Sequence, residues 1–165
     1  MTEAHPDGFL LAGRYTLLDH EHALPRLMPA AAAKNVEIIV GGPYSSGVLA
    51  GGTHFEYQKA SPEILAKVER IKGIAQRYQV PIKAAALQFS LAHPASTAVI
   101  PGFSRPERIA EDHAALKANI PDAFWHETRK QGLVAAEAPL PIDRHAKEIA
   151  RGASIRQYRH SGLAQ

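Results

Sequence analysis

Glycine and hydroxyl-bearing residues gather between Gly41 and Gly52, where their types and spacing suit the binding of an anion. The five glycines of this segment let the backbone come close to a bound group and turn its N–H donors toward it. Ser45 and Ser46 add hydroxyl donors, and Tyr44 is suited to cover a flat or extended ligand. The same composition also suits a loop whose glycines only satisfy turns. The pattern alone favours ligand binding and a simple loop equally.

A second candidate segment runs from Ile100 to Arg108. A strand ends and a helix begins within it, and the free N–H groups and dipole of a helix N-terminus favour a phosphate. Ser104, Arg105 and Arg108 lie beside this helix start, and an arginine guanidinium donates paired hydrogen bonds to phosphate oxygens. Taken alone, such a pattern is more commonly a capped helix with two solvated arginines.

Several other kinds of site are excluded by what the sequence lacks. No Lys-Ser or Lys-Thr pair follows the glycines, so the first segment is not a P-loop, and its spacing is not G-x-G-x-x-G at a helix start. The absence of cysteine excludes disulfides, thiolate zinc sites and cysteine nucleophiles. We predict no metal site, and we expect His20, His22 and His93 to be loop or helix-end residues without a catalytic role.

The elements that must position these segments follow from the hydrophobic pattern. Three apolar stretches predict β-strands over residues 8–13, 36–40 and 97–100. The middle stretch is β-branched and nearly continuous, which is typical of a parallel strand that is covered on both faces. Helical spacing and start signals predict helices over residues 24–33, 62–78, 82–93, 106–117 and 121–132. This alternation predicts an α/β fold with right-handed crossovers.

The composition fits one domain-sized unit. Of the 165 residues, 45% are hydrophobic and 21% are charged, which supports a packed core. No apolar run reaches the ~18 residues of a membrane-spanning helix, and the N-terminus has no apolar signal core. We therefore expect a soluble, cytoplasmic protein without a membrane partner. Three parallel strands leave two open edges, so we also expect the chain to be part of a larger α/β structure.

The net charge of +3 comes from the end of the chain. Residues 143–165 hold five cations and two anions, whereas residues 1–142 hold equal numbers of both signs. A protein that binds nucleic acid in a groove usually spreads basic charge over a folded face, so we expect no nucleic-acid partner. We predict a body at residues 1–142 and a basic helical tail at residues 143–165.

Four ordered motifs resemble the aldo-keto reductases, a family of NAD(P)-dependent oxidoreductases folded as (β/α)8 TIM barrels. The motifs are Leu11–Leu18, Gly41–Leu49, Ala84–Phe89, and Val99–Gly102 with Arg105–Ile109. The similarity is strongest to bacterial members of the D-threo-aldose 1-dehydrogenase, L-fucose dehydrogenase and pyridoxal 4-dehydrogenase type. The resemblance implies that residues 1–142 form the C-terminal three βα units of such a barrel.

The resemblance also implies which residues would contact NAD or NADP. They are Gly42, Tyr44, Ser46, Gly47, Gly102, Ser104, Arg105, Arg108, Glu111 and Asp112. The first four match the loop around the cofactor diphosphate, the serine and arginines match the adenosine-phosphate region, and the acidic pair matches the adenine edge. Ala12 and Gly41 replace residues that many relatives use beside the nicotinamide. Gly102 replaces a lysine of some NADP-preferring members, which leaves both cofactors open.

A complete enzyme of this family would move a hydride between the nicotinamide and an aldose or another small alcohol or aldehyde. Its catalytic Asp, Tyr, Lys and His belong to earlier strands, so we expect no catalytic residue in this chain and no turnover by the chain alone. Two alternatives stay open. The chain is an inactive product that serves as an interaction module, or it is one half of a split barrel that pairs with a complementary N-terminal half or with itself.

Overall fold

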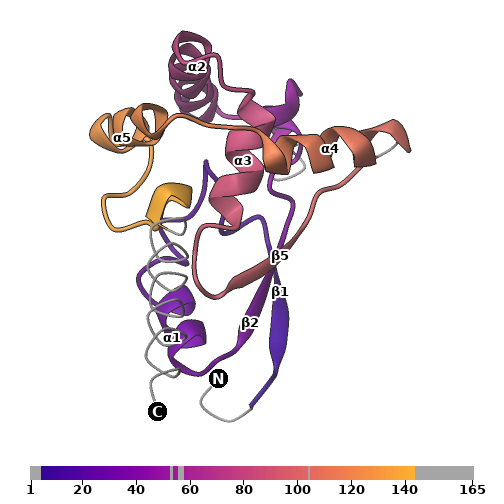
Figure 1. Ribbon diagram of the computed structural model, residues 1–165, viewed down its shortest axis with the longest axis vertical. Helices are drawn as coiled ribbons and strands as arrows, with labels where there is room; N and C mark the ends of the chain where they lie inside the picture. The colour runs from indigo at the N-terminus through magenta and orange to yellow at the C-terminus, as the bar shows by residue number, and fades with distance from the viewer. Residues whose placement is uncertain (1–4, 53, 56–57, 104, 144–165) are drawn as a thin grey trace, which may run out of the picture.

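The computed structural model describes residues 5–52, 54–55, 58–103 and 105–143. Its centre is a sheet of three strands, β1 (Gly8–Ala12), β2 (Glu37–Gly41) and β5 (Ser96–Ile100). The strands are parallel, and β2 lies between the other two (Figure 1). The parallel sheet confirms the predicted α/β fold. Apart from its first residue, the predicted basic tail lies outside the described residues.

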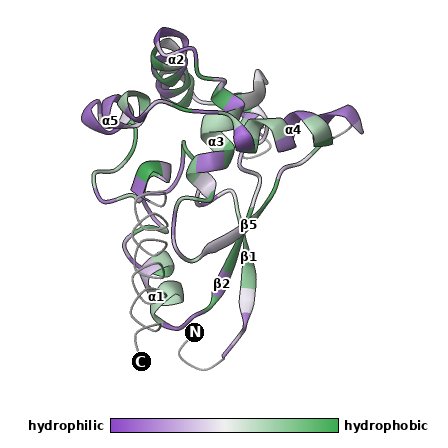
Figure 2. Cartoon of the chain, viewed as in Figure 1, coloured by the Kyte–Doolittle hydropathy of each residue, from purple (hydrophilic) through white to green (hydrophobic). Residues whose placement is uncertain are grey.

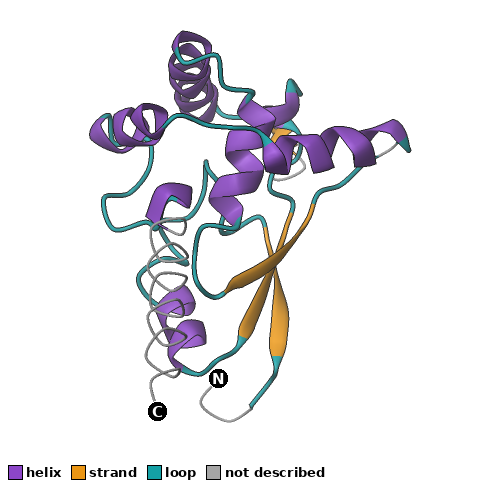
Figure 3. Cartoon of the chain, viewed as in Figure 1, coloured by secondary structure: helices purple, strands orange, loops and turns teal. Residues whose placement is uncertain are grey.

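Helices connect the strands in the predicted order (Figure 3). They are α1 (Leu27–Ala33) between β1 and β2, α2 (Pro62–Arg77) and α3 (Ile82–Ser90) between β2 and β5, and α4 (Glu107–Lys117) and α5 (Asp122–Lys130) after β5. The connection from β2 to α2 also contains a 3-10 turn, η1 (Val48–Ala50), and a short antiparallel hairpin of β3 (His54–Phe55) and β4 (Gln58–Lys59). The sequence analysis did not predict this hairpin. In the part of the chain that the structure describes, no helix is long and apolar enough to span a membrane.

Local hydrogen bonds set the ends of two helices. The hydroxyl of Ser61 accepts a hydrogen bond from the N–H of Ile64 at 3.3 Å, which confirms the predicted N-cap of α2. The prediction that the next helix reaches His93 was wrong, because α3 ends at Ser90. The Nδ1 atom of His93 accepts from the N–H of Ala95 at 3.1 Å, and the hydroxyl of Ser96 donates to the carbonyl of Ser90 at 2.6 Å. These bonds form a turn into β5 in place of a further helical turn.

One face of the sheet packs against the helices and forms the core. Ile38 and Val40 of β2 are fully buried, and Phe9, Leu11 and Val99 of the neighbouring strands pack beside them. Figure 1 shows α1 and α3 on this side of the strands, and Figure 2 shows hydrophobic residues along β1 and β2. The small side chains of the alanine run in α3, all fully buried, allow this helix to pack closely.

The opposite face of the sheet is apolar but exposed. Leu10 of β1 is 56% exposed and Ile100 of β5 is 54% exposed, and Ala12 and Ala98 are exposed as well. Side chains alternate along a strand, so these residues share the face that turns away from α1 and α3. We call Leu10, Ala12, Ala98 and Ile100 the open face. In the barrel that the sequence resembles, this face would point to the interior.

A cluster of buried rings lies beneath the strand ends. The ring of Tyr15 stacks on that of Phe89 at 5.5 Å, and the rings of His20 and His93 pack against this pair. The Nδ1 atom of His20 lies 2.9 Å from the carbonyl of Thr16, and its Nε2 atom accepts from the N–H of Ala135 at 3.1 Å. His20 is therefore a neutral ring with its proton on Nδ1, and it links the loop after β1 to the segment after α5.

Acidification should weaken the fold through His20. Burial lowers the pKa of His20 from its ordinary value of 6.5, an effect that the hydrogen bond to Thr16 partly opposes. The unfolded chain takes up a proton as the pH falls below about 6.5 whereas the folded chain does not, so the free energy of unfolding should fall over that range. Urea unfolding at about pH 7.5 and about pH 5.5 measures this loss.

A His20→Gln variant should lose most of this pH dependence. His22→Gln is the matched control, because His22 is an exposed histidine two residues away. An unchanged pH dependence in the His20 variant would assign the effect to other groups.

The chain by itself should self-associate through the open face and the free edges of β1 and β5. Exposed apolar residues and unpaired edge strands both favour association. Sedimentation velocity of the unaltered chain should show species larger than a monomer, and the double variant Leu10→Lys/Ile100→Lys should reduce them. Leu65→Lys on α2 is the control, because Leu65 is a 40%-exposed leucine outside the open face. A compact monomer of the unaltered chain at high concentration would contradict this prediction.

Candidate functional site

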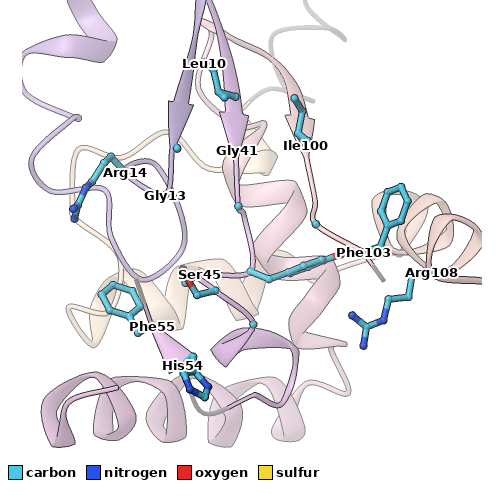
Figure 4. A pocket seen from close by; sticks show the side chains of 16 residues that line it. Leu10, Gly13, Arg14, Gly41, Ser45, His54, Phe55, Ile100, Phe103 and Arg108 are labelled. Carbon is cyan, nitrogen blue, oxygen red and sulfur yellow. The ribbon is translucent and has the colours of Figure 1, made fainter. Parts of the chain in front are cut away.

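A cleft of about 1050 Å³ lies at the carboxyl ends of the three strands. The strands run into it from one side, and the loop after β2 and the start of α4 form its walls (Figure 4). Parallel α/β proteins bind ligands at this end of their strands. The cleft is lined by Leu10, Ala12, Gly13, Arg14, Gly41, Gly42, Tyr44, Ser45, Ser46, Gly47, His54, Phe55, Ile100, Gly102, Phe103 and Arg108.

The loop after β2 has an unusual backbone. Ser45 and Ser46 have φ angles of 50° and 56°, and Gly47 follows with a φ of 95°. A left-handed conformation costs a residue other than glycine on the order of 1–2 kcal/mol. The hydroxyl of Ser45 lies 3.0 Å from that of Thr16, and its N–H donates to the carbonyl of Gly42 at 2.9 Å. The fold thus holds a strained loop, as is common at binding sites.

Tyr44 ties this loop to α4. Its hydroxyl donates a hydrogen bond to Oδ1 of Asp112 at 2.5 Å, and both side chains are buried, at 7% and 6% exposed. Lys83, from the start of α3, contacts the same carboxylate, with Nζ 3.1 Å from Oδ1 of Asp112. The Lys83 ammonium also lies 3.3 Å from Oε2 of Glu111 and 5.2 Å from the centre of the Tyr44 ring. We call Tyr44, Lys83, Glu111 and Asp112 the clasp.

The clasp keeps the Tyr44 hydroxyl protonated. Burial raises the pKa of Tyr44 far above its usual value, and the carboxylate of Asp112 raises it further by accepting the hydrogen bond. Arg108 opposes this rise only weakly. A tyrosine in this state is a poor source or acceptor of protons near neutral pH.

The second wall of the cleft contributes a cation. Arg108, in the first turn of α4, lines the cleft, and Figure 4 shows its guanidinium pointing from the helix toward the loop after β2. Gly102 lines the same wall, and a Cβ atom there would meet nothing within 4 Å, so its backbone is accessible. Arg105 is exposed and does not line the cleft, while Ser104 lies outside the described residues.

The structure brings together six of the ten residues that the sequence analysis assigned to cofactor binding. The six that line the cleft are Gly42, Tyr44, Ser46, Gly47, Gly102 and Arg108. Glu111 and Asp112 do not line the cleft, and they belong to the clasp, where Lys83 forms an ion pair with each of them.

Sequence reasoning missed several residues of the site. Arg14 lies in a quoted motif, but no local signal marked it as a cleft residue, and its guanidinium contacts Asp19 at 2.8 Å. His54 and Phe55 come from the hairpin that the pattern did not reveal, and Phe103 lies in the loop between β5 and α4. Lys83 could only have been found from its contacts with residues 28 and 29 positions away.

The charge of the lining favours an anion. Among its described residues are two arginines and no aspartate or glutamate. Ser45 and Ser46 of the loop after β2 add hydroxyl groups to the same lining. The described residues contain no group of three or more His, Asp or Glu side chains that could hold a metal ion.

Comparison with known proteins gives consistent matches. The model of the aldo/keto reductase family matches residues 2–131. Pyridoxal 4-dehydrogenase from Microbacterium luteolum is 37% identical over 139 residues, which are 82% of this chain and 40% of that protein. D-threo-aldose 1-dehydrogenase from a Pseudomonas species is 31% identical over 137 residues, which are 80% of this chain and 41% of that protein.

Solved structures match in fold. The apo form of an aldo-keto reductase from Bacillus halodurans has a TM-score of 0.57 at 21% identity, covering 82% of this chain and 46% of that one. The holo form of the same protein has a TM-score of 0.53, also at 21% identity, covering 78% of this chain and 43% of that one.

The parallel strands and the position of the cleft define an α/β protein built like part of a TIM barrel. The chain belongs to the aldo/keto reductase family. It spans about 40% of the length of the curated relatives it matches, and its described strands form an open sheet and no closed barrel. The family and the partial-barrel fold predicted from the sequence are confirmed, and both curated relatives are dehydrogenases by name.

The clasp should stabilise the fold. Tyr44→Phe removes a buried hydrogen bond to a charged group, so we expect the free energy of unfolding to fall by about 1.5–3 kcal/mol. Urea unfolding measures this change. Tyr78→Phe is the matched control, because the Tyr78 hydroxyl donates to Glu127 at 2.7 Å in a more exposed place where water can replace it. Equal losses in the two variants would argue against a special role for the clasp.

Proposed function

We propose that this chain supplies the part of an NAD(P)-dependent aldo-keto reductase that holds the diphosphate and adenosine of the cofactor. One observation carries the proposal: the described lining of the strand-end cleft has two arginines, serine hydroxyls and an open glycine-rich backbone but no carboxylate. A dinucleotide is an extended dianion or a more highly charged anion, and this lining complements it. Membership of the family supports the choice of a nicotinamide dinucleotide over other anions.

The residues present fit such a group. A Cβ atom added to Gly42 or Gly47 would meet nothing within 4 Å, so both backbones are open to a ligand. Both have positive φ angles, 64° and 95°, and their N–H groups donate to the carbonyls of Ile100 and Tyr44, so these glycines offer close approach rather than free donors. Phe55, Phe103 and the Tyr44 ring give the cleft flat apolar surfaces beside this loop.

The roles of the residues follow from their position in the cleft. The open backbone at Gly42 and Gly47 would let the diphosphate approach this loop closely, and the hydroxyl of Ser46 would bind it. The guanidinium of Arg108 would bind a phosphate on the adenosine side and fix its orientation by paired hydrogen bonds. The Tyr44 ring would cover the bound group and keep water from it. When bound, the nicotinamide exchanges a hydride with the substrate.

We propose that the substrate of the whole enzyme is an aldose or another small alcohol or aldehyde. The names of the two dehydrogenase relatives support this class. The described tyrosines are engaged elsewhere: Tyr15 in the ring cluster, Tyr44 in the clasp and Tyr78 with Glu127. The proton transfer that accompanies hydride transfer would therefore depend on residues outside this part of the chain.

The open face favours a second role for the same chain, as one half of a two-part barrel. Exposed Leu10 and Ile100 would be buried against the remaining βα units, and the edges of β1 and β5 would gain strand partners. The two roles are compatible, because closing the barrel would leave the strand-end cleft open to a ligand.

Arg108, which lines the cleft, provides the test of the proposed function. Arg108→Ala should weaken NADP+ binding by about 1.5–3 kcal/mol, the range for a hydrogen bond to a charged group. NAD+ lacks the 2′-phosphate and should lose less. Isothermal titration measures both affinities, on the chain alone or on a barrel completed with the remaining βα units.

Arg105→Ala is the matched control, because Arg105 precedes the same helix but lies outside the cleft lining. Equal losses for the two cofactors in the Arg108 variant would mean that this arginine binds the diphosphate. Failure of the unaltered protein to bind either cofactor would overturn the proposed function.

A further inference from the structure

Lys83 lies behind the cleft wall, in contact with both carboxylates of the clasp. Its Nζ is 3.1 Å from Asp112 Oδ1 and 3.3 Å from Glu111 Oε2. It also lies 5.2 Å from the centre of the ring of Tyr44, which lines the cleft. One cation thus contacts two anions, the exposed Glu111 and the buried Asp112, next to an aromatic ring that a bound ligand would contact.

Two residues of the clasp, Glu111 and Asp112, lie on the same helix as Arg108, which lines the cleft. Arg108 precedes Glu111 by three residues and Asp112 by four on α4, so the three side chains lie on one side of the helix. Without Lys83, two carboxylates would stand one turn from Arg108 and would oppose an anion bound there. Charges interact over about 8 Å at physiological ionic strength, so carboxylates one helical turn from Arg108 lie within range of an anion bound beside it.

We propose that Lys83 determines whether the cleft accepts the 2′-phosphate of NADP, by neutralising Glu111 and Asp112. Lys83 is a positioning residue, since it acts through the clasp. The inference rests on the proposed function, because it concerns the preference of the same cleft between NAD and NADP. NAD lacks the 2′-phosphate and carries less charge at its adenosine end, so its binding should depend less on Lys83.

The test uses Lys83→Met, which keeps the length of the side chain beside Tyr44 and removes its charge. We expect NADP+ binding to weaken about tenfold and NAD+ binding less than about threefold, as measured by isothermal titration of the full chain. Lys83→Arg should restore the wild-type ratio of the two affinities. In about 1 M salt the difference between the cofactors should shrink, because charge–charge interactions are screened.

Two further variants separate the effect of charge on cofactor binding from a loss of folding. Glu111→Gln removes an exposed carboxylate from the clasp and should raise the preference for NADP+ about threefold. Lys72→Met is the matched control, because Lys72 forms an ion pair with Glu69 on α2, outside the cleft. It should leave both affinities unchanged.

The outcomes separate the two proposals. An unchanged ratio of NADP+ to NAD+ affinity in both Lys83→Met and Glu111→Gln, with the wild type binding both cofactors, would overturn the role of Lys83 alone. Equal weakening of the two cofactors by Lys83→Met, with no rescue by Lys83→Arg, would assign Lys83 a purely structural role and would also overturn the inference. No binding of either cofactor by the wild type would overturn the proposed function and this inference with it.

Discussion

The hydrogen bond between Tyr44 and Asp112 joins two parts of the site that are 68 residues apart in the sequence. Tyr44 belongs to the loop after β2, and Asp112 belongs to the helix after β5. A buried carboxylate is unfavourable unless its charge is compensated, and Lys83 of α3 compensates it. This contact therefore joins three elements, and a change in any of its groups should affect Tyr44, which lines the cleft.

A second hydrogen bond connects the loop after β1 to the loop after β2. Thr16, after β1, meets the hydroxyl of Ser45 at 3.0 Å, and Ser45 is held in the left-handed conformation that its loop requires. Thr16 and Ser45 thus link the loops after β1 and β2, and Tyr44 links the loop after β2 to α4. Such links let a protein keep an unfavourable backbone conformation, because the surrounding contacts stabilise the loop as a whole. The strained backbone at Ser45 and the hydrogen bond of Tyr44 to Asp112 therefore lie in one loop and are stabilised together.

Sequence reasoning predicted the features that depend on near neighbours. The β-branched run before Gly41 predicted a parallel strand, and Ser61 with Pro62 predicted the start of α2. It failed where residues outside the predicted element decide. The turn that ends α3 depends on Ser96 bonding back to Ser90, and the site of Asp112 depends on Tyr44 and Lys83. The family motif marked Asp112 as a ligand contact, but only the fold reveals that a tyrosine of this chain occupies one of its oxygens.

The cleft and the open face are two consequences of one strand register. Because Leu11 pairs with Val40 and Val40 with Val99, these residues face the helices, and Leu10 and Ile100 on either side must face away. The same register brings the three strand ends level, where Leu10 and Ile100 also form the inner rim of the cleft. A ligand in the cleft would contact this rim from the strand ends, and a structure that covers the open face would pack against it from the side. Covering the face should therefore help to order the rim that the ligand contacts, so that closure of the sheet and ligand binding are expected to reinforce each other.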